Sequence, residues 1–271
     1  MPNESRAGAE QRWPPQRSGM DLARRPLRSA PLSVYLLDAD EELAEEFDVR
    51  MRLAVRQTAT ARVLSAECGR CDLIAWLRSV GMGPGLLVLD GIIAVETRVG
   101  GRTAMELIGA GDLLQPPGAA PDELLERSEA WRALTPARIA VLDEDFADRM
   151  RPWPEIGRAL LRRANQRIVE IDMLRAIASQ PRLEVRLVLL LWHLASRWGR
   201  VEPDGIRVSL PLTHRLLGEL VAAERPSVSH ALTRLAHAQL VVGAPGDWHL
   251  RGTLERHLDS LIERPLARQA G

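Results

Sequence analysis

The stretch GELVAAERPSVSHALTRL, residues 218–235, decides the fold because a proline stands inside a pattern that otherwise predicts helix. Apolar residues recur at helical spacing on both sides of Pro226, from Leu216 to Leu235. Proline lacks a backbone N–H, and in the first turn of a helix this group has no intrahelical partner. We therefore expect Pro226 to begin a second helix, directly after Arg225, and not to break a single long one.

The segment predicts two short helices joined by a tight link, which is typical of a helix-turn-helix. Thr213 offers a hydroxyl cap to the first helix, and Gly218 lets the second helix come close. The second helix is expected to expose hydrogen-bonding side chains and no carboxylate over its first turns: Arg225, Ser227, Ser229, His230 and Thr233. Such a face suits a groove lined with phosphates. An ordinary pair of core helices would give the same apolar pattern.

Two predicted hairpins flank the helix pair. VEPDGIRVSL, residues 201–210, has an Asp-Gly turn, and VVGAPGDWHLRG, residues 241–252, has Gly and Pro at its tip. This order of strand pair, two helices and strand pair predicts a winged helix-turn-helix. Upstream, apolar spacing predicts a long amphipathic helix from Pro154 to Ser179 and a second helix from Leu183 that Gly199 caps.

The first half of the chain has a different pattern of apolar residues. From Leu32 to Phe146, short apolar runs alternate with glycine and proline, and Gly100-Gly101 is a hairpin signal between two such runs. The sequence therefore predicts an α+β fold with a mostly β first domain and a boundary near residue 150. The expected divisions are a flexible tail (1–30), the β domain (31–150), the long helix (151–180), the winged helix-turn-helix (181–252) and a C-terminal tail (253–271).

Composition restricts the class of protein. The chain carries 36 basic and 36 acidic side chains, so a nucleic-acid surface would have to be a local patch. It has only two cysteines, too few for a disulfide framework, and no apolar run of the length a membrane span needs. The N-terminal residues lack the apolar core of a secretory signal. We expect a cytoplasmic protein, and no Ser/His/Asp constellation favours an enzyme.

The segment LTHRLLGELVAAERPSVSHALTRLAHAQLV, residues 212–241, resembles the DNA-binding motif of the Crp/Fnr family of bacterial transcription regulators. A Thr-led helix and an Arg-x-(Ser/Thr)-Val start of the recognition helix recur in that family. GAGDLL, residues 109–114, looks like a turn of the family's cyclic-nucleotide-binding fold, and ARIAVLDEDF, residues 137–146, like its last sensor strand. The resemblance covers roughly residues 32–252 and implies a β-roll sensor, a dimerisation helix and a winged helix-turn-helix.

The resemblance also implies partners and roles. It indicates a homodimer, formed through the helix near 154–179, that regulates transcription by binding specific double-stranded DNA, with RNA polymerase as a candidate partner and an unknown effector. Arg225 is the expected base reader, since Arg pairs bidentately with guanine, followed by Ser229 and His230, with Thr233 on the same face. The expected phosphate contacts are Thr213, His214, Arg215 and Ser227. Pro226 stands where the family often has Glu, so no base preference is carried over.

The matching part of the sensor departs from the family members that bind cyclic nucleotides. In GDLLQPPGAAPDELLERSEAWRA, residues 111–133, Gln115-Pro116 stands where those members have Gly-Glu. Pro116 and Pro117 remove two N–H groups that a phosphate cradle would need. Arg127 and Ser128 fall close to the phosphate-binding positions. We expect cyclic AMP and cyclic GMP to bind poorly.

Cys68 and Cys71 form a Cys-x-x-Cys pair that could serve a redox switch or half of a zinc site. No neighbouring His or Cys completes a metal site, so we expect two ordinary thiols, no metal and no cofactor. One alternative function remains open, in which a ligand- or redox-sensing module is centred on this pair and the winged helix binds a protein partner. A sensor or scaffold without DNA binding is another.

Overall fold

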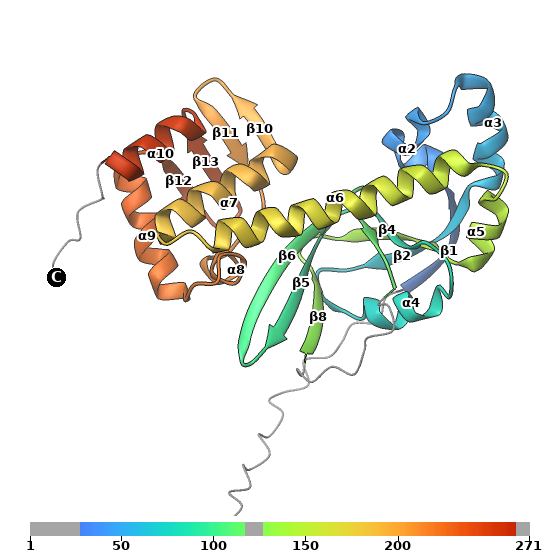
Figure 1. Cartoon of the computed structure of the whole chain (residues 1–271), viewed down its shortest axis with the longest axis horizontal. Coiled ribbons are helices and arrows are strands. Elements are labelled where there is room, and N and C mark those ends of the chain that lie inside the picture. The colour runs from blue at the N-terminus through green and yellow to red at the C-terminus, as the bar shows by residue number, and fades with distance from the viewer. Residues whose placement is uncertain (1–27, 117–126, 264–271) are drawn as a thin grey trace, which may run out of the picture.

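The computed structural model describes residues 28–116 and 127–263 of the chain. A β-rich N-terminal part and a smaller C-terminal part lie at opposite ends of one long helix, α6 (Pro154–Ala178) (Figure 1). None of the helices in these two ranges combines the length and the apolar character needed to span a membrane. The expected N-terminal tail lies outside the described ranges except for residues 28–30, which already belong to the first strand.

The N-terminal part consists of two sheets with short helices around them. One sheet has the order β1-β2-β9-β4-β7 and the other has the order β3-β8-β5-β6. The strands are β1 (Arg28–Tyr35), β2 (Thr60–Ala66), β3 (Gly69–Cys71), β4 (Gly85–Asp90), β5 (Ile92–Val99), β6 (Arg102–Gly109), β7 (Leu113–Leu114), β8 (Arg127–Ala133) and β9 (Ala137–Leu142). The helices are α1 (Leu36–Ala39), α2 (Glu41–Glu45), α3 (Val49–Thr58), α4 (Leu73–Ser79) and α5 (Glu144–Met150). This arrangement confirms the predicted β-roll.

The β5–β6 hairpin confirms the turn that the sequence predicts. Gly100 and Gly101 have φ values of 55° and 77°, which an L side chain rarely adopts. Two successive residues with positive φ form the tight hairpin turn whose twist matches that of the flanking strands. The two strands pair along their whole length, from Ile92 opposite Gly109 to Val99 opposite Arg102. The hairpin is therefore regularly paired from its base to its tip.

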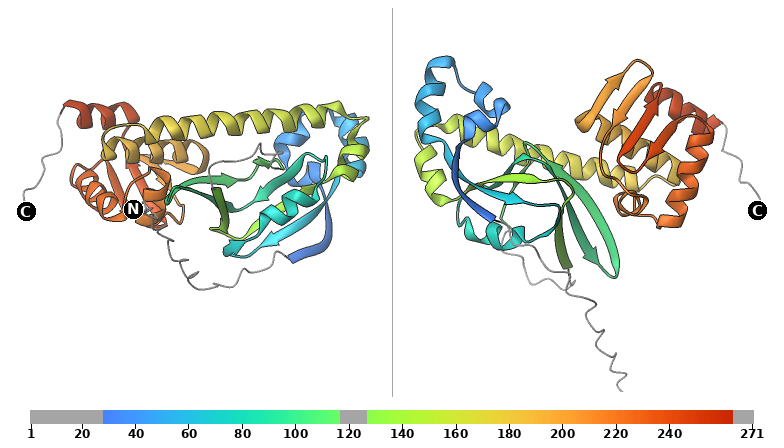
Figure 2. Two further views of the ribbon diagram at one scale, coloured as in Figure 1. Left: turned by 60° about the horizontal axis from the view of Figure 1, so that its bottom comes forward. Right: turned by 180° about the vertical axis from the view of Figure 1, so that it is seen from behind.

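Helix α6 begins and ends as the sequence predicts. Pro154 lies in its first turn, and Ser179 is its C-terminal cap. In both views of Figure 2 the helix runs along the β-roll and continues into the C-terminal part. Because an α-helix rises by about 1.5 Å per residue, a helix of this length is able to reach from the β-roll into the C-terminal part.

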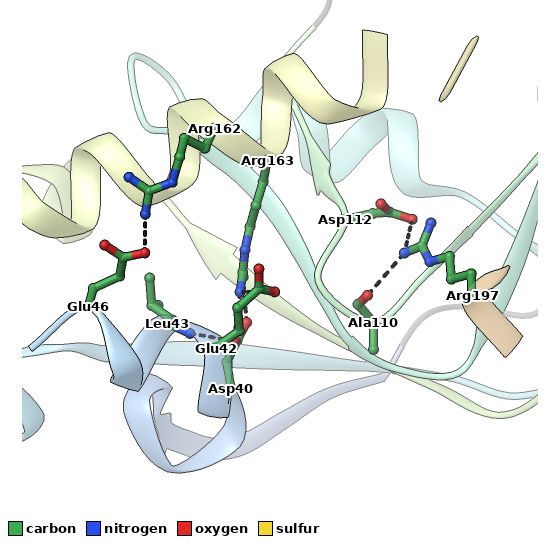
Figure 3. A network of polar contacts seen from close by, with 9 residues as sticks. All are labelled: Asp40, Glu42, Leu43, Glu46, Ala110, Asp112, Arg162, Arg163 and Arg197. Atoms are coloured by element: carbon green, nitrogen blue, oxygen red, sulfur yellow. Dashed lines mark hydrogen bonds and ion pairs between the residues drawn. The ribbon is translucent and has the colours of Figure 1, made fainter. Parts of the chain in front are cut away.

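A buried arginine fastens α6 to the N-terminal helices (Figure 3). The Arg163 guanidinium donates to both carboxylate oxygens of Asp40, one of them at 2.7 Å, and to Glu42 at 3.2 Å. The side chains of Arg163 and Asp40 are each only 8% exposed. Asp40 also caps α2, because its Oδ1 accepts from the Leu43 N–H at 3.0 Å. The Arg163 side chain is thus turned towards the N-terminal helices.

The C-terminal part is a helical layer beside a four-stranded sheet with the order β10-β11-β13-β12. Its helices are α7 (Leu183–Trp198), α8 (His214–Leu220), α9 (Arg225–His237) and α10 (Leu254–Glu263). Its strands are β10 (Gly199–Glu202), β11 (Gly205–Val208), β12 (Val241–Ala244) and β13 (Asp247–Arg251). Both predicted hairpins are present, and Gly199 caps α7 as expected.

The expectation of a C-terminal tail from residue 253 is wrong for its first half, because α10 occupies it. His257 is fully buried there, and its ring accepts a hydrogen bond at Nδ1 from the Trp192 indole N–H at 3.2 Å. The opposite ring nitrogen of His257 bonds to the Arg251 carbonyl oxygen. Leu261 is also fully buried. These contacts with α7 and β13 stabilise a short segment whose sequence alone predicts little.

The β5–β6 hairpin and the C-terminal helices share one hydrophobic core. Ala94, Met105 and Leu107 of the hairpin are buried in the same cluster as the leucines of α7, α8 and α9. The Trp198 indole lies against Gly109, where an added Cβ would come within 2.9 Å of the ring. Next to it, Arg197 pairs with Asp112 at 2.8 Å and donates to the Ala110 carbonyl oxygen at 3.0 Å (Figure 3).

Candidate nucleic-acid interface

Helices α8 and α9 form the predicted helix-turn-helix. The Thr213 hydroxyl caps α8 by accepting from the Leu216 N–H at 3.2 Å. A Cβ at Gly218 would lie 2.5 Å from the Ala223 carbonyl oxygen, so only glycine lets the turn fold back onto α8. The close approach that the sequence predicts is therefore made chiefly by the turn backbone. Ala222, in the turn itself, has a φ of 54°.

Pro226 lies in the first turn of α9, as predicted, and the helix begins one residue earlier, at Arg225. Glu224 is the N-cap residue, but its side chain makes no capping hydrogen bond. The first N–H groups of α9 therefore have no side-chain cap. Such N–H groups, at the positive end of the helix dipole, are suited to bind phosphate.

The outer face of α9 carries donors and no acid. Arg225, Ser227 and His230 are exposed, and within the described residues none of their side chains has a hydrogen-bond or ion-pair partner. No Asp or Glu lies between Arg225 and His237. These three side chains are therefore available to an external acceptor, and no local carboxylate would repel a phosphate.

The other two predicted residues of α9 use their hydroxyls inside the protein. Ser229 donates to the Arg225 carbonyl oxygen at 3.1 Å, and its Oγ lies 2.8 Å from His214 Nδ1. Thr233 donates to the Ser229 carbonyl oxygen at 3.0 Å. If Ser229 donates to the carbonyl, its oxygen accepts from Nδ1–H of His214. Ser229 thus links the start of α8 to the second turn of α9.

Arg215 extends from the first turn of α8 and is exposed. Its Nε donates to Glu219 at 2.9 Å, and this hydrogen bond raises the pKa of Arg215 further above its ordinary value. Thr213, His214 and Arg215 therefore lie together at the start of α8, and the His214–Ser229 contact joins them to α9. Within the described residues, none of these three side chains is hydrogen-bonded or ion-paired to Ser227 or His230.

The sensor hairpin lies directly beside this surface, which the sequence did not predict. Helix α8 packs on β6, and Arg102 at the hairpin tip lies 3.6 Å from Glu224, just before α9. No local sequence signal connects residues so far apart in the chain.

At the other end of the C-terminal part, the β12–β13 tip, residues 244–247, carries one acid and no base. That tip therefore offers no cation to DNA.

A cavity of about 970 Å³ lies between the β-roll and α6, and the end of α8 closes part of it. Arg127 and Gln115 contribute to its wall, and Arg127 is paired with Glu129 at 3.4 Å. Burial raises the pKa of Glu106 in the same wall, although Arg167 opposes the shift. Pro117, the second proline expected to disfavour a phosphate cradle, lies outside the described residues. Ser128 is exposed and does not line this cavity.

The two cysteines differ in environment. Cys68 is exposed in a loop, whereas Cys71 is buried in β3, and both are free thiols. Burial raises the pKa of Cys71 to about 11. A thiol with so high a pKa carries little thiolate at neutral pH, and the thiolate is the reactive form.

Comparisons with known proteins agree with this geometry. Residues 185–251 match the Crp-like helix-turn-helix domain. The global nitrogen regulator of Synechococcus elongatus is 26% identical over 110 residues, which cover 40% of this chain and 50% of that protein. The CRP-like cAMP-activated global transcriptional regulator of Mycobacterium tuberculosis is 30% identical over 115 residues, 41% of this chain and 50% of that protein. The matches thus span about half the length of these relatives, and both are regulators and not enzymes.

Solved structures share the fold over most of the chain. A transcriptional regulator of the CRP/FNR family from Thermus thermophilus matches with a TM-score of 0.52 and 21% identity, over 74% of this chain and 98% of that one. A CooA mutant from Carboxydothermus hydrogenoformans matches with a TM-score of 0.56 and 14% identity, over 87% of this chain and 99% of that one. At these identities the likeness concerns the fold alone.

Proposed function

Because the chain carries a Crp-like helix-turn-helix domain on a Crp/Fnr-type fold, we propose that it is a sequence-specific DNA-binding regulator of transcription that acts as a dimer. One observation carries this proposal: the outer face of α9 presents an unpaired arginine at its start and has no carboxylate along its length. A recognition helix needs such a face to enter the major groove.

The roles of the individual residues follow from which of their hydrogen-bonding groups have no partner within the described residues. Arg225 is the base reader, because its guanidinium is exposed and can pair bidentately with guanine. His230 and Ser227 lie on the same exposed face and complete the contact. Arg215 and the backbone at the start of α8 hold phosphates and so fix the orientation of the protein. Ser229 supports the surface through His214 and is a weaker candidate for direct reading.

The dimer is proposed to form through α6. Large apolar side chains on this helix are exposed in the described part of the chain: Leu161 (59% exposed), Ile168 (59%), Val169 (64%) and Met173 (49%). Such a stripe on a long helix indicates a helix partner, and a twofold dimer would present two recognition helices at once. Arg163 pairs with Asp40 at the N-terminal helices and Arg167 pairs with Glu106 of β6, so neither arginine belongs to this exposed stripe.

A binding selection from a random-sequence duplex pool, with and without reductant, tests the proposal. The expected result is enrichment of a sequence with two symmetric half-sites about one helical turn apart, equally with and without reductant. Failure to shift any duplex at low salt, by protein that is dimeric in solution, would contradict it. Binding that reductant switches on or off would favour a redox module at Cys68 and Cys71.

Cyclic nucleotides are not the effectors in this proposal. Arg127, the residue that would face a cyclic phosphate, is paired with Glu129, and Pro116 has no N–H to offer. A calorimetric titration of the full chain with cyclic AMP or cyclic GMP should show no saturable heat. Micromolar affinity for either nucleotide would overturn this part of the proposal and leave DNA binding untouched.

A further inference from the structure

Three metal-ligating side chains meet on the sheet of the C-terminal part, away from α8 and α9. Glu202 ends β10, Asp204 lies in the turn before β11, and His249 is in the middle of β13. Their nearest ligand atoms, Nε2 of the imidazole and one oxygen of each carboxylate, all lie within 4.8 Å of one another. The sequence alone predicts no metal site, and only Cys68 and Cys71 have a spacing that suggests one.

The two distances from the imidazole are near those of a coordination sphere. His249 Nε2 lies 3.3 Å from Asp204 Oδ1 and 3.7 Å from Glu202 Oε2. Zinc binds nitrogen and oxygen ligands at about 2.0–2.1 Å, so two ligands of a tetrahedral zinc ion are about 3.3–3.4 Å apart. Small side-chain movements would therefore bring all three atoms around one ion, and the backbone would not have to move.

The imidazole nitrogen has Asp204 Oδ1 as its nearer ion-pair contact, at 3.3 Å. His249 Nε2 is shielded from solvent, and within the described residues it makes no hydrogen bond although two carboxylates face it. Buried polar atoms are normally hydrogen-bonded, and a ring nitrogen that faces two carboxylates without a hydrogen bond is arranged as a metal ligand would be. Asp204 is 65% exposed, so the cluster is open to solvent on one side and an ion can enter.

A second layer of contacts holds the carboxylate in place. Arg207 Nε lies 3.1 Å from the other oxygen of Glu202, as an ion pair. Glu202 Oε2 is the oxygen that lies near the imidazole, and outer polar contacts of this kind orient the ligands of metal sites. Residue 207 lies opposite 249 in the β11–β13 ladder, so the sheet itself fixes this arrangement.

We propose that Glu202, Asp204 and His249 bind one divalent transition-metal ion, best matched by zinc, with water in the remaining position. One nitrogen and two oxygen ligands with an open fourth position suit zinc. The ion would tie the β10–β11 turn to β13 and so stiffen the sheet on which α8 and α9 rest. The site is independent of DNA binding, and it can be tested without DNA.

The experiment is a calorimetric titration of zinc chloride into full-length protein freed of metal with EDTA. We expect one ion per chain, a Kd in the micromolar range or tighter, and a rise in Tm on zinc addition. His249→Gln and Asp204→Asn should each weaken binding by about tenfold or more. Both are polar substitutions of similar size in a strand and a turn, and circular dichroism would verify that each variant is folded.

Two matched controls exclude other zinc-binding groups. His237→Gln removes an exposed histidine at the end of α9, and Cys68→Ser removes the exposed thiol. Both variants should bind zinc as the parent does. Absence of saturable binding by the parent would overturn the proposal, and the three residues would then form only an ion-pair cluster. Binding that survives in His249→Gln or is lost in Cys68→Ser would overturn it as well.

Discussion

Replacing Arg163 by alanine should destabilise the protein far more than the loss of a surface ion pair can. The change leaves the Asp40 carboxylate, 8% exposed, without the guanidinium that holds both of its oxygens. Removing one partner of a buried pair typically costs about 3–5 kcal/mol, because the remaining charge stays buried and unpaired. At about 2–4 °C per kcal/mol for a chain of this size class, Tm should fall by roughly 6–20 °C.

The neighbouring arginine is a matched control for this experiment. Arg162 lies on the same turn of α6 and pairs with Glu46, but its side chain is 58% exposed (Figure 3). Arg162→Ala should lower the free energy of unfolding by no more than about 1 kcal/mol, since exposed ion pairs contribute little to stability. The double variant Arg163→Met with Asp40→Asn should recover much of the lost stability, because it removes both charges together.

Urea unfolding followed by tryptophan fluorescence measures these differences, since Trp153 packs against the same cluster of side chains at the start of α6. All variants should be compared at one protein concentration, because dimerisation would shift apparent stability. If Arg163→Ala is no more destabilising than Arg162→Ala, the buried pair does not hold α6 and the reasoning fails. If the double variant is as unstable as the single one, the loss comes from packing and not from an unpaired charge.

Four further predictions concern other parts of the chain. Arg225→Ala should reduce the discrimination between operator and random DNA by about 1–3 kcal/mol. Arg215→Ala should instead weaken binding to all duplexes and flatten the salt dependence of binding. A fluorescence-anisotropy salt series separates the two effects, and equal losses of affinity in both variants would reject the assigned roles. Burial lowers the pKa of His257, so its contribution to stability is complete above the unfolded value of about 6.5 and is lost as pH falls through the folded pKa. Urea unfolding between pH 7.5 and 5.5 should show this loss, with a shallower slope in His257→Gln; an unchanged slope would argue against it. Gly218→Ala should lower the free energy of unfolding by about 1–3 kcal/mol, because the added Cβ would lie 2.5 Å from the Ala223 carbonyl oxygen. An unchanged Tm would mean that the turn can move to make room for the methyl group. Leu161→Glu should convert the dimer to a monomer in light scattering, and a dimer that persists would place the interface elsewhere.

The sequence predicted those features whose signals are local. Pro226 and the Thr213 cap marked the two helix starts, and Gly100-Gly101 marked the hairpin, because each depends on a backbone requirement of a few consecutive residues. Apolar periodicity likewise predicted α6 and α7 with nearly the observed ends.

Features that depend on distant partners were missed or misassigned. The burial of Arg163 depends on an acid more than 100 residues away, and α10 is held by Trp192 and by the backbone of Arg251. Ser229 looked like a reading residue, but its hydroxyl bonds to His214 and to its own helix. Such pairings follow from the tertiary fold, and composition or spacing within one segment carries no record of them.

The fit of Trp198 against Gly109 limits how this protein could be taken apart and reassembled. The indole leaves no space for a Cβ on β6, so the two positions are complementary although they belong to different halves of the chain. Because the hairpin also contributes Ala94, Met105 and Leu107 to the core beneath α7–α9, a graft of the C-terminal part onto a foreign sensor would expose that core. A working chimera would therefore have to carry the β5–β6 hairpin along with the helices it supports.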